Sequence, residues 1–211
     1  MNNLPVGLLL AAGRGHRFDP SGTTNKLLAR LNAANWPDET ISEAAAGAMC
    51  AALQTVYAIV RVEAGADELA NRLQTRGCRI LRCPCADEGM GSVLAWATSL
   101  MPPAHPIIVA LADMPFIRPA TIVRVAAGLS EYELVAPAYA GRRGHPVGFG
   151  GRFRAQLQEL SGDTGARELL ASGRSSLHLI EVDDPGVVFD IDLPSDLARV
   201  GADGTASASQ S

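Results

Sequence analysis

Short apolar segments, each long enough for one buried strand, alternate along the chain with longer segments in which apolar residues recur at helical spacing. Strands are predicted at residues 6–12, 55–63, 78–83, 106–112 and 133–140. Helices are predicted at residues 41–54, 67–77, 92–101 and 119–130. This alternation predicts a mostly parallel sheet with helices on both faces, which is a three-layer α/β/α fold.

The pattern changes after residue 141. It predicts a short strand at 145–150, helices beginning near Gly151 and Thr164, strands at 176–182 and 186–192, and a last helix from Pro194. A half of this kind commonly adds an antiparallel strand or hairpin to a parallel sheet. No repeat or linker interrupts the chain, so we expect a single domain over residues 1–200. Residues 201–211 are small and polar and predict a disordered tail.

Charge and cysteine content exclude several classes of partner. The 22 acidic and 18 basic residues give a net charge of −4, and the basic residues are scattered, which argues against a nucleic-acid partner. Cys50, Cys78, Cys83 and Cys85 form no CxxC pair and have no histidine near them in sequence, so reduced structural thiols are a better interpretation than zinc ligands.

The apolar start of the chain does not resemble a targeting segment. No basic region precedes the apolar residues 4–12, and the first arginines, Arg14 and Arg17, come after them. No segment reaches the roughly 18 to 20 apolar residues that a membrane span requires. We therefore expect a cytoplasmic protein with no membrane partner.

A glycine-rich turn follows the first predicted strand, in "LLLAAGRGHRF". The turn after the first strand of a parallel sheet is the usual place for a phosphate. Gly13 and Gly15 would let backbone N–H groups approach an anion, and Arg14, Arg17 and Lys26 would supply positive charge. The turn is neither a complete GxGxxG nor a P-loop, and taken alone it is weak evidence that is also open to a purely structural interpretation.

Carboxylates follow two other apolar segments. Asp113 ends the strand "PIIVALA", where a buried carboxylate needs a partner or a metal, although it could also simply begin the turn before Pro115. In "VVFDIDLPSDL", the alternation predicts Asp190 and Asp192 on one face of a strand, where they repel each other unless a cation lies between them. Asp196 is expected to support the start of the final helix.

Six motifs together carry a family resemblance. The stretches "LLLAAGRGHRF…NKLL", "EGMGSVLAWA", "ALADMPFI", "RRGHPVGF", "SGDTGARELL" and "DIDLPSDL" occur in order over residues 6–198. They resemble the MobA-like nucleotidyltransferases, and most closely the molybdenum cofactor cytidylyltransferases. Arg17 and Lys26 match the arginine and lysine of the family's opening motif, but "FDPSGTTN" replaces the usual short link between them. The segment after Leu28 is also more polar than is usual in the family.

The resemblance implies a Rossmann-like fold of the nucleotide-diphospho-sugar transferase type that binds a nucleoside triphosphate and Mg²⁺. The implied reaction is attack by the terminal phosphate of molybdopterin on the α-phosphorus of CTP, with release of pyrophosphate. The attacking phosphate is already an anion at neutral pH, so alignment and charge neutralisation can suffice for catalysis. The implied catalytic residues are Arg17, Lys26 and Asp113, and the metal would lie on Asp113 with Asp190 or Asp192.

Further roles follow from the same resemblance. Residues expected to bind the nucleotide are Leu10, Ala11, Ala12, Gly13, Arg14, Gly15, Lys26, Gly91 and Ser92. His145 and Arg167 are expected to bind the acceptor. Ala12 favours the cytidylyl branch of the family, although it could simply be a packing residue. Three other residues also have a structural alternative: Ser92 could be a helix N-cap, His145 a structural residue and Arg167 a solvent-exposed residue.

Other functions fit the same motifs, which mainly report a triphosphate and a metal. The donor could be GTP, or the acceptor another phosphorylated small molecule. In a different class, the protein could be a catalytically silent chaperone that binds nucleotide or cofactor and serves a molybdenum oxidoreductase. The combination of Lys26 with Asp113 favours an enzyme over a binder. The sequence gives neither the oligomeric state nor the downstream partner.

Overall fold

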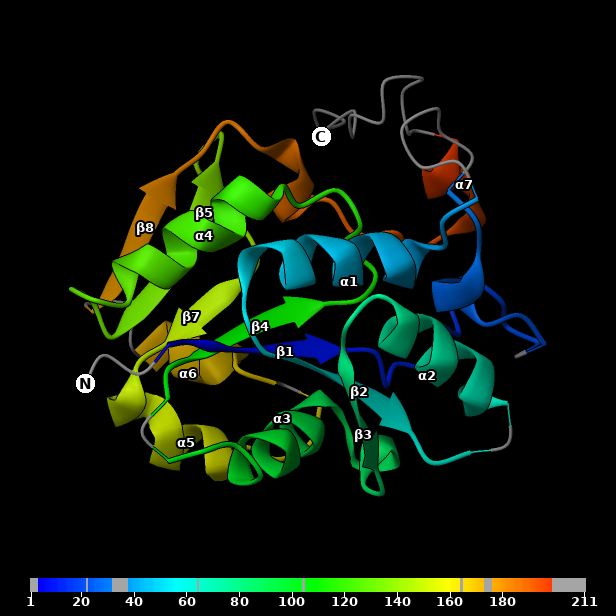
Figure 1. Ribbon diagram of the computed structural model, residues 1–211, viewed down its shortest axis with the longest axis horizontal. Coiled ribbons are helices and arrows are strands. Elements are labelled where there is room, and N and C mark those ends of the chain that lie inside the picture. The colour runs from blue at the N-terminus through cyan, green and yellow to red at the C-terminus, as the bar shows by residue number, and fades with distance from the viewer. Residues whose placement is uncertain are drawn as a thin grey trace.

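The computed structural model describes residues 4–21, 23–31, 38–63, 65–103, 105–163, 165–172 and 176–198. The predicted tail at 201–211 lies outside these residues. A single eight-stranded sheet has the order β3-β2-β1-β4-β7-β5-β6, and β8 pairs with β5 (Figure 1). The strands are β1 (Val6–Leu10), β2 (Val56–Arg61), β3 (Arg79–Cys83), β4 (Ile107–Leu111), β5 (Leu134–Tyr139), β6 (Arg142–Arg143), β7 (Val147–Phe149) and β8 (Leu177–Glu181).

The first half of the sheet is parallel, as the sequence predicts. β1 lies between β2 and β4 and is parallel to both, and β3 extends the sheet beyond β2. Strands that run in the same direction end at the same edge of the sheet. The turns after Leu10, Arg61, Cys83 and Leu111 are therefore brought together at the carboxyl edge.

Helices cover both faces of the sheet (Figure 1). α1 (Ile41–Ala52), α2 (Ala66–Thr75) and α4 (Pro119–Gly128) pack on one face, and α3 (Met90–Ser99), α5 (Arg154–Gln158) and α6 (Arg167–Ser172) pack on the other. Successive residues of β1 point to opposite faces, so Leu8 joins the core on the α3 side and Leu9 the core on the α1 side. This explains why the strand is apolar throughout rather than alternating.

Local sequence sets several helix ends. Thr40 and Glu43 form a capping box at the start of α1, in which each side chain accepts a hydrogen bond from the other residue's backbone N–H. Pro119 occupies the first turn of α4, where its missing N–H costs nothing. α3 begins at Met90, two residues earlier than predicted, because Gly89, with a φ of +101°, serves as its N-cap.

The second half adds the predicted antiparallel element. β7 is antiparallel to both β4 and β5, while β8 is parallel to β5. The two-residue strand β6, which was not predicted, pairs antiparallel with the end of β5.

The predicted strand at residues 186–192 is wrong. Pro185–Val188 is a 3-10 helix (η4), which the Asp184 carboxylate caps by accepting a hydrogen bond from the Gly186 N–H. The chain then continues extended without joining the sheet as a strand. The Ile191 N–H donates to the Asp113 carbonyl at 3.0 Å, so this segment lies beside the end of β4. Asp196, in α7 (Pro194–Leu197), accepts hydrogen bonds from the N–H groups of Asp192 and Leu193, which is the supporting role expected of it.

Among the described residues, no helix combines the length and apolar character needed to span a bilayer.

Candidate active site

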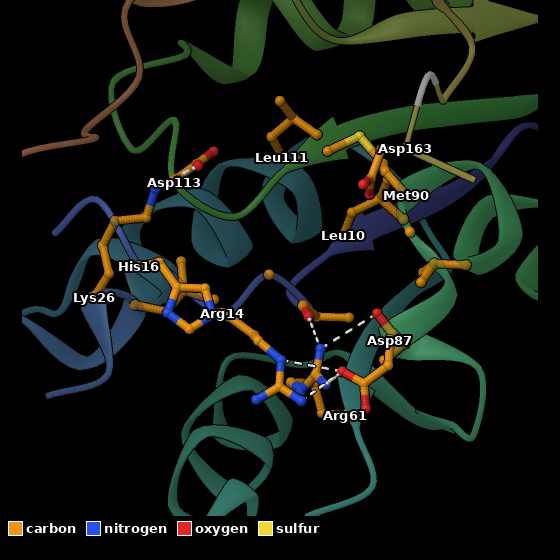
Figure 2. Close-up of a pocket in the computed structure, with 17 residues that line it drawn as sticks. Leu10, Arg14, His16, Lys26, Arg61, Asp87, Met90, Leu111, Asp113 and Asp163 are labelled. Atoms are coloured by element: carbon orange, nitrogen blue, oxygen red, sulfur yellow. Dashed lines mark hydrogen bonds and ion pairs between the residues drawn. The ribbon is translucent and has the colours of Figure 1, made fainter. Parts of the chain in front are cut away.

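A cavity of about 400 Å³ opens at the carboxyl edge of the parallel strands. It lies between the glycine-rich turn, the end of β4 and the start of α3 (Figure 2). Leu10, Ala12, Gly13, Arg14, Gly15, Lys26 and Asp113 line it, all of them expected from the sequence. Ala11 is buried in the core instead.

The glycine-rich turn has the backbone freedom that its sequence suggests. Gly15 has a φ of +66°, and a Cβ at this position would lie 3.1 Å from the Lys26 Cβ, so both conformation and space call for glycine. Gly13 borders open space, since a Cβ there would meet none of the described heavy atoms within 4 Å. A ligand can therefore approach the backbone at Gly13 closely.

The inserted segment between Arg17 and Lys26 is held by its own carboxylate. Asp19 accepts hydrogen bonds from the hydroxyls of Ser21 and Thr23 and from the Ser21 and Thr24 N–H groups, at 2.5–2.9 Å. These bonds to the charged form hold the Asp19 pKa well below its usual range. Asp19 thus ties together Ser21, Thr23 and Thr24, and Lys26 still reaches the cavity.

Lys26 is the centre of the charged cluster. It is only 8% exposed, and its Nζ lies 2.8 Å from Asp113 Oδ2 and 3.3 Å from Asp192 Oδ1. Asp192 Oδ2 also pairs with the exposed Arg17 at 2.5 Å. Lys26 is the only lysine among the 18 Lys and Arg residues of the sequence. Residues from three distant segments therefore meet at one ammonium group.

The carboxylates near Lys26 are the candidate ligands for a cation. Asp113 Oδ1 is buried and has no hydrogen-bond partner among the residues that the structure describes. Desolvation raises the Asp190 pKa, and the charges of Asp192 and Asp113 raise it further. Within the described ranges, no group of three or more His, Cys, Asp or Glu side chains is arranged to hold a metal ion by itself. Two carboxylates with phosphate oxygens and water remain a suitable ligand set for a hard divalent cation.

A second charged cluster lies at the other end of the cavity (Figure 2). Asp87 accepts from Arg14 at 2.6 Å and also pairs with Arg61. Both arginines lower the Asp87 pKa through hydrogen bonds and charge. Sequence reasoning did not single out Arg61 or Asp87, since each looks like an ordinary charged residue near an element end.

Gly91 and Ser92 do not line the cavity; Gly89, Met90 and Val93 of the same segment do. The Gly91 N–H donates to the Gly162 carbonyl at 2.7 Å, and Ser92 Oγ accepts from the Gly162 N–H at 3.2 Å. Ser92 is not the N-cap of α3, which is Gly89.

Those contacts place the loop at residues 161–163 against the start of α3. Asp163 of that loop lines the cavity, as does His16 from the glycine-rich turn. The sequence predicts no site role for either residue.

The two residues expected to bind the acceptor differ in their surroundings. His145 is mostly buried, and its Nδ1 has no hydrogen-bond partner within the described part of the chain. Burial, followed by the charge of Arg143, lowers the His145 pKa to about 4, while Asp113 opposes the shift. His145 is therefore neutral at pH 7. Arg167 is exposed at the start of α6 and is not among the residues lining the cavity.

Known structures share this architecture. A homologue of Rv0371c from mycobacterium sp. strain JC1 is 27% identical, with a TM-score of 0.70 over 92% of this chain and 93% of that one. Rv0371c of Mycobacterium tuberculosis H37Rv is 24% identical, with a TM-score of 0.75 over 94% and 97%. A manganese complex of Rv0371c also matches at 22% identity, with a TM-score of 0.64 over 86% and 89%.

A nucleotidyl transferase from Methanothermobacter thermautotroptrophicus, Mth528, is 22% identical, with a TM-score of 0.76 over 94% of this chain and 96% of that one. No curated protein sequence matches the chain. The family model of the MobA-like NTP transferase domain matches residues 7–178, which carry both the glycine-rich turn and the Lys26–Asp113 pair. The chain belongs to the MobA-like NTP transferase family and is a nucleotidyltransferase.

Proposed function

We propose that the protein transfers CMP from CTP to the terminal phosphate of molybdopterin and releases pyrophosphate. The observation that carries the proposal is the pairing of Lys26 with Asp113 in a cavity beside the glycine-rich turn. A triphosphate needs backbone N–H donors, a cationic side chain and a metal-binding carboxylate close together, and this cavity brings the three together.

In this proposal, the backbone at Gly13 and Gly15 binds the triphosphate and Lys26 stabilises the charge that passes to pyrophosphate. Arg17, which is 78% exposed in its side chain, is free to move from Asp192 to a phosphate oxygen. No protein nucleophile is required, because the acceptor phosphate is anionic at neutral pH.

Asp113 would hold Mg²⁺ together with Asp192 or Asp190. The buried Asp113 Oδ1, which has no hydrogen-bond partner among the described residues, fits such a role, and the manganese complex of Rv0371c supports a divalent cation in a protein of this fold. When bound, the metal would neutralise phosphate charge and polarise the α-phosphoryl group.

The choice of CTP rests on Ala12, where the guanylyl-transferring branch tends to have glycine, and the choice of acceptor rests on the resemblance of the C-terminal motifs. His145 and Arg167 are the proposed acceptor contacts. Neutral His145 can donate or accept a hydrogen bond but is unsuited to pairing with a phosphate through charge.

The test combines binding and turnover. Thermal-shift titrations with CTP, GTP and ATP in the presence of Mg²⁺ or Mn²⁺ should show the largest stabilisation with CTP, because a pocket that hydrogen-bonds one base leaves polar groups unpaired with another. Pyrophosphate release should require both CTP and molybdopterin.

The outcomes separate the alternatives. Equal or greater stabilisation by GTP would overturn the choice of base. Pyrophosphate release with another phosphorylated acceptor but not with molybdopterin would overturn the choice of acceptor. Nucleotide binding without turnover would favour the chaperone for a molybdenum oxidoreductase.

A further inference from the structure

Arg61 joins the two turns that border the cavity. Its side chain projects from the carboxyl end of β2, and the residue is only 8% exposed. One guanidinium nitrogen, Nη1, donates to the Ala12 carbonyl at 2.9 Å and to the Ala86 carbonyl at 3.3 Å. The other, Nη2, pairs with Asp87.

Two acidic side chains also balance the positive charge of Arg61. Nε donates to Glu63 at 3.1 Å, so two carboxylates face the guanidinium. Desolvation acts to lower the Arg61 pKa, but hydrogen bonds and charge from Asp87 and Glu63 outweigh it and raise the pKa. A planar guanidinium can hold several acceptors in fixed directions at once, which an ammonium cannot.

The two carbonyls belong to the two sides of the proposed nucleotide site. Ala12 begins the glycine-rich turn, and Ala86 begins the 3-10 helix η2 (Ala86–Glu88), which leads into α3. Ala12, Ala86 and Asp87 all line the cavity, as does Arg61 itself. No strand pairing holds these turns together, because they follow β1 and β3, which are separated by β2.

We propose that Arg61 is a positioning residue that fixes the spacing between the glycine-rich turn and the η2 turn, and so preorganises the cavity for a nucleoside triphosphate. The inference rests on the proposed binding of the triphosphate in this cavity. Preorganisation matters here because any freedom of the turns before binding must be lost on binding, which weakens affinity.

Arg14 and Arg61 share Asp87 but differ in mobility. The Arg14 side chain is 49% exposed, whereas that of Arg61 is 9% exposed and anchored to two backbone carbonyls. Arg14 can therefore exchange Asp87 for a phosphate oxygen, while Arg61 keeps the η2 turn in place. The separation of a fixed arginine from a movable one assigns positioning to Arg61 and ligand contact to Arg14.

The test uses Arg61→Met, which keeps much of the side-chain length and removes every N–H donor of the guanidinium. We expect the KM for the nucleotide to rise about tenfold or more, with kcat at saturating nucleotide within about twofold of the parent and the KM for the acceptor unchanged. Arg61→Lys keeps the charge but cannot reach all the acceptors, so its nucleotide KM should lie between those of the parent and Arg61→Met. This second variant keeps the test available if Arg61→Met does not fold.

Arg154→Met is the matched control. Arg154 also donates to two backbone carbonyls, those of Met101 and Pro102, but it lies outside the cavity. We expect both Arg61→Met and Arg154→Met to lose thermal stability, but only Arg154→Met to keep the parent's nucleotide KM.

Equal nucleotide KM values for the parent and both Arg61 variants would overturn the inference, as would the same rise in Arg154→Met. Failure of the parent to bind any nucleoside triphosphate would overturn the proposed function along with it, so a direct binding titration of the parent distinguishes the two failures.

Discussion

Lys26 Nζ lies 2.8 Å from Asp113 Oδ2, although 87 positions separate the two residues in sequence. The ammonium is almost fully buried, so its charge depends on Asp113 and Asp192 for compensation. In the proposed reaction, phosphate oxygens would take the place of these carboxylates as its partners, and Asp113 with Asp192 or Asp190 would hold the metal. In this proposal, the pair would couple substrate binding to metal binding.

Lys26→Ala is expected to lower turnover by on the order of 10²-fold, the loss typical of removing one preorganised charge donor. Pyrophosphate release at saturating nucleotide measures it. Arg30→Ala is the control, because Arg30 pairs with exposed Asp38 and does not line the cavity. Turnover close to that of the parent in Lys26→Ala would mean that the lysine only balances Asp113 and Asp192.

Asp113→Asn should keep the fold and abolish most metal-dependent turnover, because the amide preserves the shape but not the charge that a hard cation requires. Circular dichroism and melting check the fold, and pyrophosphate release across Mg²⁺ and Mn²⁺ titrations checks the activity. If the variant releases pyrophosphate as fast as the parent at low Mg²⁺, the Asp113 carboxylate is structural and the metal ligands must be reassigned to Asp190 and Asp192.

Asp184→Asn is the comparison variant for Asp113→Asn, because the Asp184 carboxylate holds the fold together and does not line the cavity. Asp184 is 2% exposed and accepts from Thr121 Oγ1 at 2.6 Å and from the N–H groups of Arg118 and Gly186 at 2.9 and 3.1 Å. The free energy of unfolding should fall by about 1–3 kcal/mol, because a buried acceptor is replaced by a group that is partly a donor. Denaturant unfolding measures this loss, and the nucleotide KM should not change.

Asp190→Asn should stabilise the metal-free protein at pH 7. A raised pKa means that folded Asp190 binds more protons than the unfolded residue between pH 3.8 and its own higher pKa, so stability falls as pH rises through that window. The neutral asparagine side chain of the variant does not have to ionise, so this loss of folding stability disappears. The melting temperature of the variant should exceed that of the parent at neutral pH but not near pH 3. Asp192→Asn should do the opposite at pH 7, since it removes a partner of Lys26 and Arg17. A lower melting temperature for Asp190→Asn at pH 7 would contradict this account.

His145 predicts a second dependence on pH, of opposite sign. Its pKa is about 4 in the folded protein against 6.5 ordinarily, so the unfolded chain binds more protons between these values and stability is lost as pH falls from 6.5 to 4. The loss is at most roughly 3 kcal/mol. His145→Gln should flatten the stability profile in this window. Melting temperatures of the parent and the variant between pH 4 and 7 measure the difference.

The sequence predicts the parallel sheet and its helices well because their signals are local: apolar segments, a capping box and a proline at a helix start. The error at residues 186–192 has a physical reason. The alternation that suggested a strand is real, since Phe189 and Ile191 are buried, but Ile191 bonds to the Asp113 carbonyl beyond the end of β4 rather than to a strand. Burial alternates in any extended segment that lies on a core, whether or not it joins a sheet.

Only part of the candidate site could be predicted from the sequence, for a related reason. Gly13, Gly15, Lys26 and Asp113 belong to recognisable motifs, and the structure brings them to one cavity. Arg61 lies in no motif, and its importance comes from contacts with Ala12 and Ala86, which are 49 and 25 positions away. Every residue has a backbone carbonyl, so the sequence does not show which carbonyls accept hydrogen bonds from Arg61, and residue spacing cannot predict these contacts.

The lone lysine makes amine chemistry unusually selective in this protein. Apart from the chain's α-amino group, Lys26 is the only aliphatic amine in the sequence, and it is largely buried. Acylation neutralises an ammonium, and here that ammonium faces two carboxylates beside the candidate nucleotide cavity. Each molecule that carries an acetylated lysine therefore carries it at Lys26, and the modified fraction read by mass spectrometry equals the fraction that has lost this charge.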